Sequence, residues 1–180
     1  TFSTTRGTLV PANGVATTNA SGVATVTVSS SNAGAGTVTA TGTGVTAQRI
    51  IEFVATAPAS IDVQPGVFTL SPSTQTPITA IVRDAQSNLV KNVVVSFSVV
   101  QDTTGGNLSV GSAITDSQGR AQSVYTAGST ASGQNGVTIR ASVLPLGGGP
   151  AITRDVQLTV ATRAVSISLG TGNTITEPSV

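Results

Sequence analysis

Few residues in this sequence are of the types that catalyse reactions. None of its 180 residues is His or Cys, so the commonest general base, the thiol nucleophile and any disulfide are all missing. A serine activated by lysine would depend on Lys91, the one lysine, which lies in the segment LVKNV beside a predicted turn. Because long charged side chains are mostly exposed at such positions, we expect Lys91 to have a solvated structural role.

Paired carboxylates are the other common source of acid and base chemistry. The aspartates are far apart in sequence and fall at predicted turns or strand edges; they are Asp62, Asp84, Asp102, Asp116 and Asp155. An aspartate at a turn usually caps its own backbone. The sequence therefore predicts no catalytic residue, and we expect that the protein is not an enzyme.

Metal and cofactor sites are not indicated either. Calcium needs six to eight oxygen ligands, and the candidate Asp62 has Ser168 as its counterpart in an internal repeat described below, so a repeated calcium site is not expected. The glycine-rich segments NAGAGT (32–37) and GTGNT (170–174) match no complete phosphate-binding motif and are interpreted as hairpin turns. We therefore expect no metal and no cofactor.

Charge and hydropathy exclude two classes of partner. The net charge is +1, with eight Lys and Arg residues against seven Asp and Glu, and the basic residues are scattered singly, unlike the basic patch that binds nucleic acid. No apolar run approaches the roughly 20 residues of a membrane helix, and the N-terminus lacks a signal pattern. We expect no nucleic-acid partner and either a removed targeting segment or an internal fragment.

Aromatic residues are scarce, which weakens the case for a sugar platform. They form 3% of the chain, with one Tyr and no Trp, whereas interface hot spots rely on exposed aromatic rings. Phe53, Phe68 and Phe97 fit strand cores, as does Phe2. We expect Tyr125 to pack at the edge of a sandwich, with its hydroxyl reaching water or backbone.

Alternation of apolar and polar residues with period two indicates β-strands throughout. In NVVVSFSV the side chains of Val93, Val95, Phe97 and Val99 share one face. Similar alternation recurs at 137–143, 155–160 and 165–169. Turn signals separate the strands, at DAQSN (84–88), TTGGN (103–107), DSQG (116–119), SGQNG (132–136) and LGGGP (146–150). This spacing predicts an all-β chain of antiparallel sandwiches, with no helix longer than a turn.

The chain also repeats itself. VATAPASIDVQPG (54–66) recurs as VATRAVSISLGTG (160–172), and ATTNASGVATVTV (16–28) matches AITDSQGRAQSVY (113–125). The repeat predicts the rear part of an incomplete immunoglobulin-like domain at 1–57, a complete domain at 58–163, and the first strand of a following domain at 164–180. Roughly 100 residues is the usual size of such a sandwich.

The central repeat resembles a known family. The segments ITAIVRDAQSNLVKNVVVSFSV (78–99), GNLS (106–109), ITDSQGRAQSVYTAG (114–128) and GVTIRASV (136–143) are similar to the group 1 bacterial Ig-like domain (Big-1) of invasin and intimin stalks. The sequence departs from the usual pattern at Gln86-Ser87-Asn88, where a Gly-Asn turn is commoner. The resemblance implies Greek-key β-sandwiches in tandem on a bacterial outer surface, anchored in the outer membrane or secreted.

Two functions follow from these expectations. The first is a structural spacer in the stalk of a bacterial cell-surface adhesin, with neighbouring Ig-like domains of the same protein as its partners. The alternative is an adhesion module that binds a host receptor or glycan through loops such as QDTTGGN (101–107) and AGSTASGQNG (127–136).

A partial domain at 1–57 would expose an unpaired sheet edge and an apolar face. We expect this face to be covered, either by a longer parent chain or by residues 164–180 of a neighbouring copy acting as a donated strand.

Overall fold

The described part of the protein is built from β-strands alone. A computed structural model describes residues 1–162 of the chain, and within them fourteen strands and no helix are found. The predicted strand at 164–180 lies outside the described residues. The all-β, immunoglobulin-like fold class predicted from alternation is confirmed.

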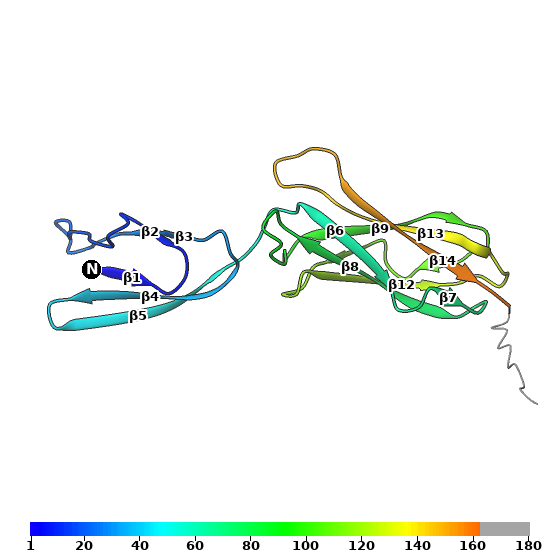
Figure 1. Cartoon of the computed structure of the whole chain (residues 1–180), viewed down its shortest axis with the longest axis horizontal. Helices are drawn as coiled ribbons and strands as arrows, with labels where there is room; N and C mark the ends of the chain where they lie inside the picture. The colour runs from blue at the N-terminus through cyan, green and yellow to red at the C-terminus, as the bar shows by residue number, and fades with distance from the viewer. Residues whose placement is uncertain (163–180) are drawn as a thin grey trace, which may run out of the picture.

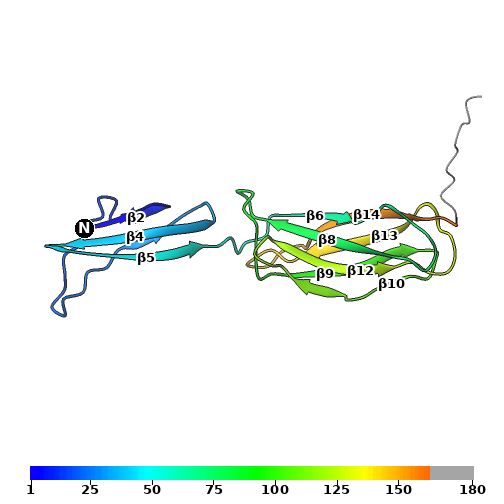
Figure 2. The ribbon, with the colours of Figure 1, turned by 90° about the horizontal axis from the view of Figure 1, so that it is seen from below.

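Strands β6 to β14, here called the central unit, form two facing sheets (Figure 2). The four-stranded sheet has the order β10-β12-β8-β6 and the five-stranded sheet has the order β11-β9-β13-β14-β7. Their bounds are Ser60–Pro65, Thr69–Leu70, Gln75–Arg83, Val94–Asp102, Asn107–Leu108, Ser112–Ile114, Arg120–Thr126, Gly133–Val143 and Ile152–Val160. All neighbouring strands pair antiparallel except β7 with β14.

One hydrophobic core lies between these two sheets. Ile78, Val82, Val95, Ile139 and Leu158 are completely buried there, and each comes from a strand with alternating exposure. Burying a side chain of this size contributes about 1.5–3 kcal/mol. Without disulfides, this packing is the main source of stability.

Strands β1 to β5, here called the N-terminal unit, form two smaller sheets, β1-β4-β5 and β2-β3. Their bounds are Phe2–Thr4, Thr8–Val10, Thr27–Ser29, Gly34–Gly42 and Val45–Phe53. The N-terminal unit and the central unit lie end to end along the long axis of the molecule, joined by one short segment (Figure 1).

Strand registers in the two units correspond at several residue pairs. Phe2 pairs with Ala40 as Phe97 pairs with Ala141. Leu9 likewise pairs with Val28 as Leu108 pairs with Tyr125, and Val38 pairs with Arg49 as Ile139 pairs with Val156. The N-terminal unit thus resembles strands β9, β10 and β12 to β14 of the central unit in its pairing.

The inner face of the N-terminal unit is less buried than its counterpart. Ile139 and Leu158 are completely buried in the central unit, whereas the equivalent Val38 and Ile51 are only partly buried. The described residues of the N-terminal unit contain no strands equivalent to β6 and β8, which belong to the sheet that covers this face in the central unit, and none equivalent to β7, which extends the β9-β13-β14 sheet beside β14.

Three local predictions were wrong. Phe68 is 63% exposed because it lies in the loop before β7, and Leu70 takes the core position instead. NAGAGT is mostly strand β4: an added Cβ at Gly36 would lie 3.0 Å from the Cβ of Arg6, so the glycine permits close packing where a turn was expected. SGQNG lies almost entirely within β13, which absorbs Asn135 (φ 55°) as an irregularity.

Of the residues predicted to share one face of β9, Val95 and Phe97 are buried as expected. Val99 is 36% exposed. It lies beside the shift in register by which Val99 and Gln101 pair with consecutive residues of β13, so Val100 is an extra residue in the strand.

Candidate functional site

The structure places the five candidate aspartates in separate turns and strands. Asp84 and Asp116 each accept hydrogen bonds from backbone N–H groups of their own turns, and these bonds lower the pKa of the exposed Asp116 carboxyl. Asp155 binds Arg140 through two bonds of 2.7 Å. Residues 1–162 contain no group of three or more acidic side chains that could hold a metal ion, and Asp62 lies exposed on β6.

Asp102 is the centre of a partly buried network in the central unit. It accepts hydrogen bonds from the Tyr125 hydroxyl (2.7 Å), the Thr104 hydroxyl and N–H, and the Gly106 N–H. Burial raises the pKa of Asp102, but these bonds outweigh it and hold the pKa below its ordinary value. Burial, together with Asp102, raises the pKa of Tyr125 to about 12.

This network corrects the expectation for Tyr125. Its ring is completely buried, and its hydroxyl donates to a carboxylate. The network fixes the loop between β9 and β10 from inside, and Gly128 N–H adds a bond to the Thr104 hydroxyl. Each of these groups has structural partners, so the arrangement holds the fold and leaves no free acid–base pair among them.

The side-chain hydrogen bonds found between the two units lie at the junction, defined here as residues 31–34, 52–59 and 83–91. The link Val54–Ala59 between β5 and β6 includes buried Ala55 and Pro58, and Ala55 forms a parallel bridge with Val90. Proline fixes one backbone dihedral of this link and restricts the residue before it. The link is thus held against the central unit at Ala55 and at Ala59, whose N–H donates to the Arg83 carbonyl.

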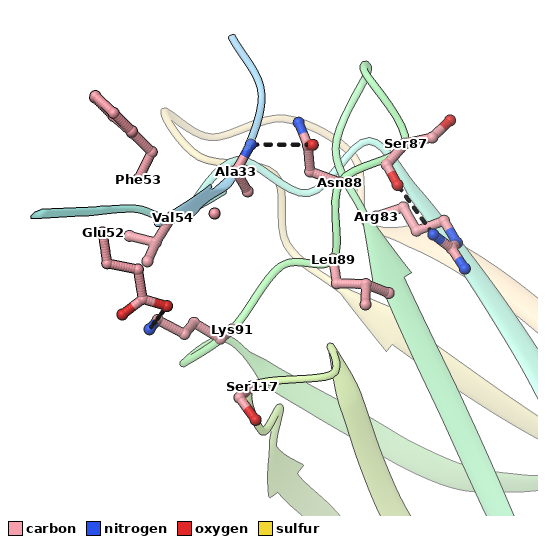
Figure 3. A pocket seen from close by; sticks show the side chains of 11 residues that line it. Ala33, Glu52, Phe53, Val54, Arg83, Ser87, Asn88, Leu89, Lys91 and Ser117 are labelled. Carbon is pink, nitrogen blue, oxygen red and sulfur yellow. Dashed lines mark hydrogen bonds and ion pairs between the residues drawn. The ribbon is translucent and has the colours of Figure 1, made fainter. Parts of the chain in front are cut away.

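Asn88 joins the two units through its side chain (Figure 3). Its Oδ1 accepts from the Ala33 N–H at 3.1 Å, and its Nδ2 donates to the Ser31 carbonyl at 3.0 Å. The same Nδ2 donates to Asp84 Oδ2 at 2.9 Å. Both amide hydrogens are therefore used, and the Asn88 side chain is held from two sides.

Lys91 also contacts the N-terminal unit, which corrects its predicted solvated role. Its ammonium lies 3.0 Å from the Glu52 carboxylate, with 24% of the lysine side chain and 62% of the glutamate side chain exposed. A pair this exposed contributes at most about 1 kcal/mol. The ion pair is therefore expected to add little to the stability of the junction.

Two hollows adjoin the junction, with volumes of about 400 Å³ and about 330 Å³, and both are lined by Ala33, Phe53, Val54 and Asn88. The larger hollow is the one in Figure 3. Its cations are already engaged, because Lys91 pairs with Glu52 and Arg83 donates to the Ser87 carbonyl. Of the five candidate aspartates, Asp84 alone lines either hollow, and there it is bonded within its turn.

One surface feature was missed by the sequence reasoning, which saw only a turn at LGGGP. The eight-residue loop Leu144–Ala151 joins β13 to β14, whereas the equivalent β4–β5 connection is the two-residue turn Thr43-Gly44. Leu144 and Leu146 are 70% and 72% exposed. The internal repeat of the sequence contained the signal for the longer connection in the central unit. It contained no signal for the exposure of Leu144 and Leu146.

Comparison with solved structures supports the fold. FdeC, an adhesin of Escherichia coli, has a TM-score of 0.64 at 22% identity, over 89% of this chain and 51% of FdeC. The adhesin InvE of Yersinia pseudotuberculosis gives 0.46 at 18% identity, over 89% and 48%, and domains 4 and 5 of the S-layer protein SbsC give 0.38 at 17%, over 89% and 70%. Since a TM-score below 0.5 does not establish a shared arrangement, FdeC is the one of these three that bears on the fold.

The chain spans about half the length of the two adhesin structures it matches. No model of a known protein family matches the sequence, and no curated protein matches it either. Residues 1–162 form no helix with the length and apolar character of a membrane span. What the comparisons show is therefore an all-β, immunoglobulin-like fold shared with an adhesin.

Proposed function

We propose that the chain is a structural spacer in a bacterial cell-surface adhesin. The observation that carries this proposal is the direct bonding across the junction, where Asn88 and the packed link join the two units end to end. A spacer needs length and continuity rather than a reacting pair. Four of the five candidate aspartates, namely Asp84, Asp102, Asp116 and Asp155, take part in structural hydrogen bonds or an ion pair. The likeness of the fold to FdeC is consistent with an extracellular location on the bacterial surface, anchored in the outer membrane or secreted.

The proposal includes the domain division predicted from the repeat: a partial domain at 1–57, a complete domain at 58–163 and the start of another at 164–180. Its partners would be neighbouring Ig-like domains of the same protein. The matching registers of the two units support a tandem arrangement.

The test is to display the chain on a bacterial surface through a carrier, with an epitope tag at its outer end. A spacer is expected to move the tag away from the surface without conferring attachment to host cells or to a glycan array. Attachment by the chain itself, lost on loop substitution while the folded state is kept, would refute the spacer function.

A second candidate is the adhesion module that binds a receptor or glycan through its loops. The observation that favours it is the loop Leu144–Ala151, which has no charged residue and exposes two leucines that the first repeat lacks. Exposed aliphatic side chains on a long loop suit protein recognition better than sugar recognition. The predicted loop 101–107 is less suited, because the Asp102 network fixes it internally.

A further inference from the structure

The turn at 84–88 is built to hold one side chain in a fixed direction. Asp84 Oδ1 accepts from the N–H groups of Gln86 and Asn88, and Asp84 Oδ2 accepts from the side chain of Asn88. Ser87 has φ 65°, a conformation that non-glycine residues rarely adopt. The turn alone therefore orients the Asn88 amide, without any contact to the N-terminal unit.

What this amide contacts is the main chain of the N-terminal unit. The Ser31 carbonyl and the Ala33 N–H, two residues apart, meet the Nδ2 and the Oδ1 of Asn88. A donor and an acceptor on one planar group, matched to an acceptor and a donor, define a direction as well as a distance. Two such bonds oppose rotation of one unit about the link more effectively than a single contact.

Other contacts at the junction are less directional. The Lys91–Glu52 pair joins two long side chains, and the glutamate is mostly exposed, so this pair permits a range of orientations. The bridge between Ala55 and Val90 joins the link to the central unit and does not involve the sheets of the N-terminal unit.

We infer that Asn88 is a positioning residue that sets the orientation of the N-terminal unit relative to the central unit. Its side chain forms hydrogen bonds with backbone atoms of the N-terminal unit, and the Asp84 turn orients the side chain for these bonds. The inference deepens the proposed spacer function: it specifies what makes the spacer stiff at this junction. It differs from that function in its test, because a chain that bends at the junction could still separate two points.

The experiment measures residual dipolar couplings of the full 180-residue chain in a weakly aligning medium, for the native chain and for N88A. In the native chain the N–H vectors of both units are expected to fit one alignment tensor. In N88A the two units are expected to need different tensors, while chemical shifts away from the junction stay unchanged. A single shared tensor in N88A would overturn the inference.

Three further variants separate this role from general effects. N107A is the matched control, because Asn107 is an exposed asparagine of the same unit with no side-chain hydrogen bond found in the described residues; it should keep the shared tensor. N88D loses the bonds donated to Ser31 and to Asp84 Oδ2 and brings two carboxylates together, so it should give separate tensors as N88A does. K91A should keep the shared tensor; separate tensors in K91A with a shared one in N88A would assign the role to the ion pair.

Discussion

At the scale of single residues, the contact that the sequence did not predict joins two side chains far apart in the chain. Tyr125 was expected at the sandwich edge because alternation places a residue on a face but does not identify what it meets there. Its partner Asp102 is 23 residues away, at the end of a different strand. Asp84 was different, since a turn aspartate bonds its own backbone, and that local rule predicted its role correctly.

Removing the Tyr125 hydroxyl should destabilise the central unit. Y125F keeps the buried ring but deletes the bond to Asp102, and hydrogen bonds to charged groups contribute about 1.5–3 kcal/mol. We expect a loss of this size in the free energy of unfolding measured by urea denaturation. S98A, on an exposed position of β9, should change it by less than about 0.5 kcal/mol; equal values for the two variants would show that the network does not stabilise the fold.

The same network should make the stability of the central unit fall at both high and low pH. The pKa of Tyr125 is raised from 10.0 to about 12, so its contribution to stability is complete below pH 10 and is lost as pH rises toward 12, because the unfolded chain ionises first. The pKa of Asp102 is lowered from 3.8, so its contribution is present above that value and is lost as pH falls below it. Unfolding free energies across pH should show both losses, and Y125F should lose the alkaline step that belongs to this tyrosine.

At the scale of elements, the sequence predicts strands well and their connections less well. Alternation identifies β9, β13 and β14, because one face of each is buried against a sheet. Glycine-rich segments were misjudged, since glycine serves close strand packing at Gly36 as readily as it serves a turn. The registers shared by the two units show that the strands, more than the loops, define the repeat.

The loop Leu144–Ala151 should be dispensable for folding. Replacing it with Thr-Gly, the connection found in the N-terminal unit, keeps Val143 beside Ile152 as Gly42 lies beside Val45. Because loop-closure entropy varies slowly with length, we expect a change in unfolding free energy of at most about 1 kcal/mol. Circular dichroism and urea denaturation measure this, and a chain that fails to fold would contradict it.

At the scale of the whole molecule, the two units form an elongated arrangement along one axis (Figure 1). The repeat in the sequence predicts a domain boundary near Pro58, which stays a prediction. It could not predict the contacts across that point, because Asn88 meets atoms of residues 31 and 33 that carry no sequence signal. Main-chain recognition leaves no pattern in the amino acids being recognised.

The ion pair across the junction should contribute little to stability. In a double-mutant cycle of E52A and K91A, we expect a coupling energy below about 1 kcal/mol, falling further as salt rises. The coupling energy of Arg140 and Asp155, which form two bonds of 2.7 Å within the central unit, serves as the reference value. A coupling above 2 kcal/mol for Lys91 and Glu52, on the order of a buried pair, would show that the junction depends on charge.

Recognition through backbone atoms also bears on how such a protein can change over generations. Asn88 bonds only to a carbonyl and an N–H of the N-terminal unit. Most substitutions at positions 31 to 33 therefore leave the contact intact. Proline at position 33 is an exception, because it has no N–H. In the proposed tandem spacer, a repeat that keeps the asparagine would therefore keep this contact while the side chains of its neighbour diverge.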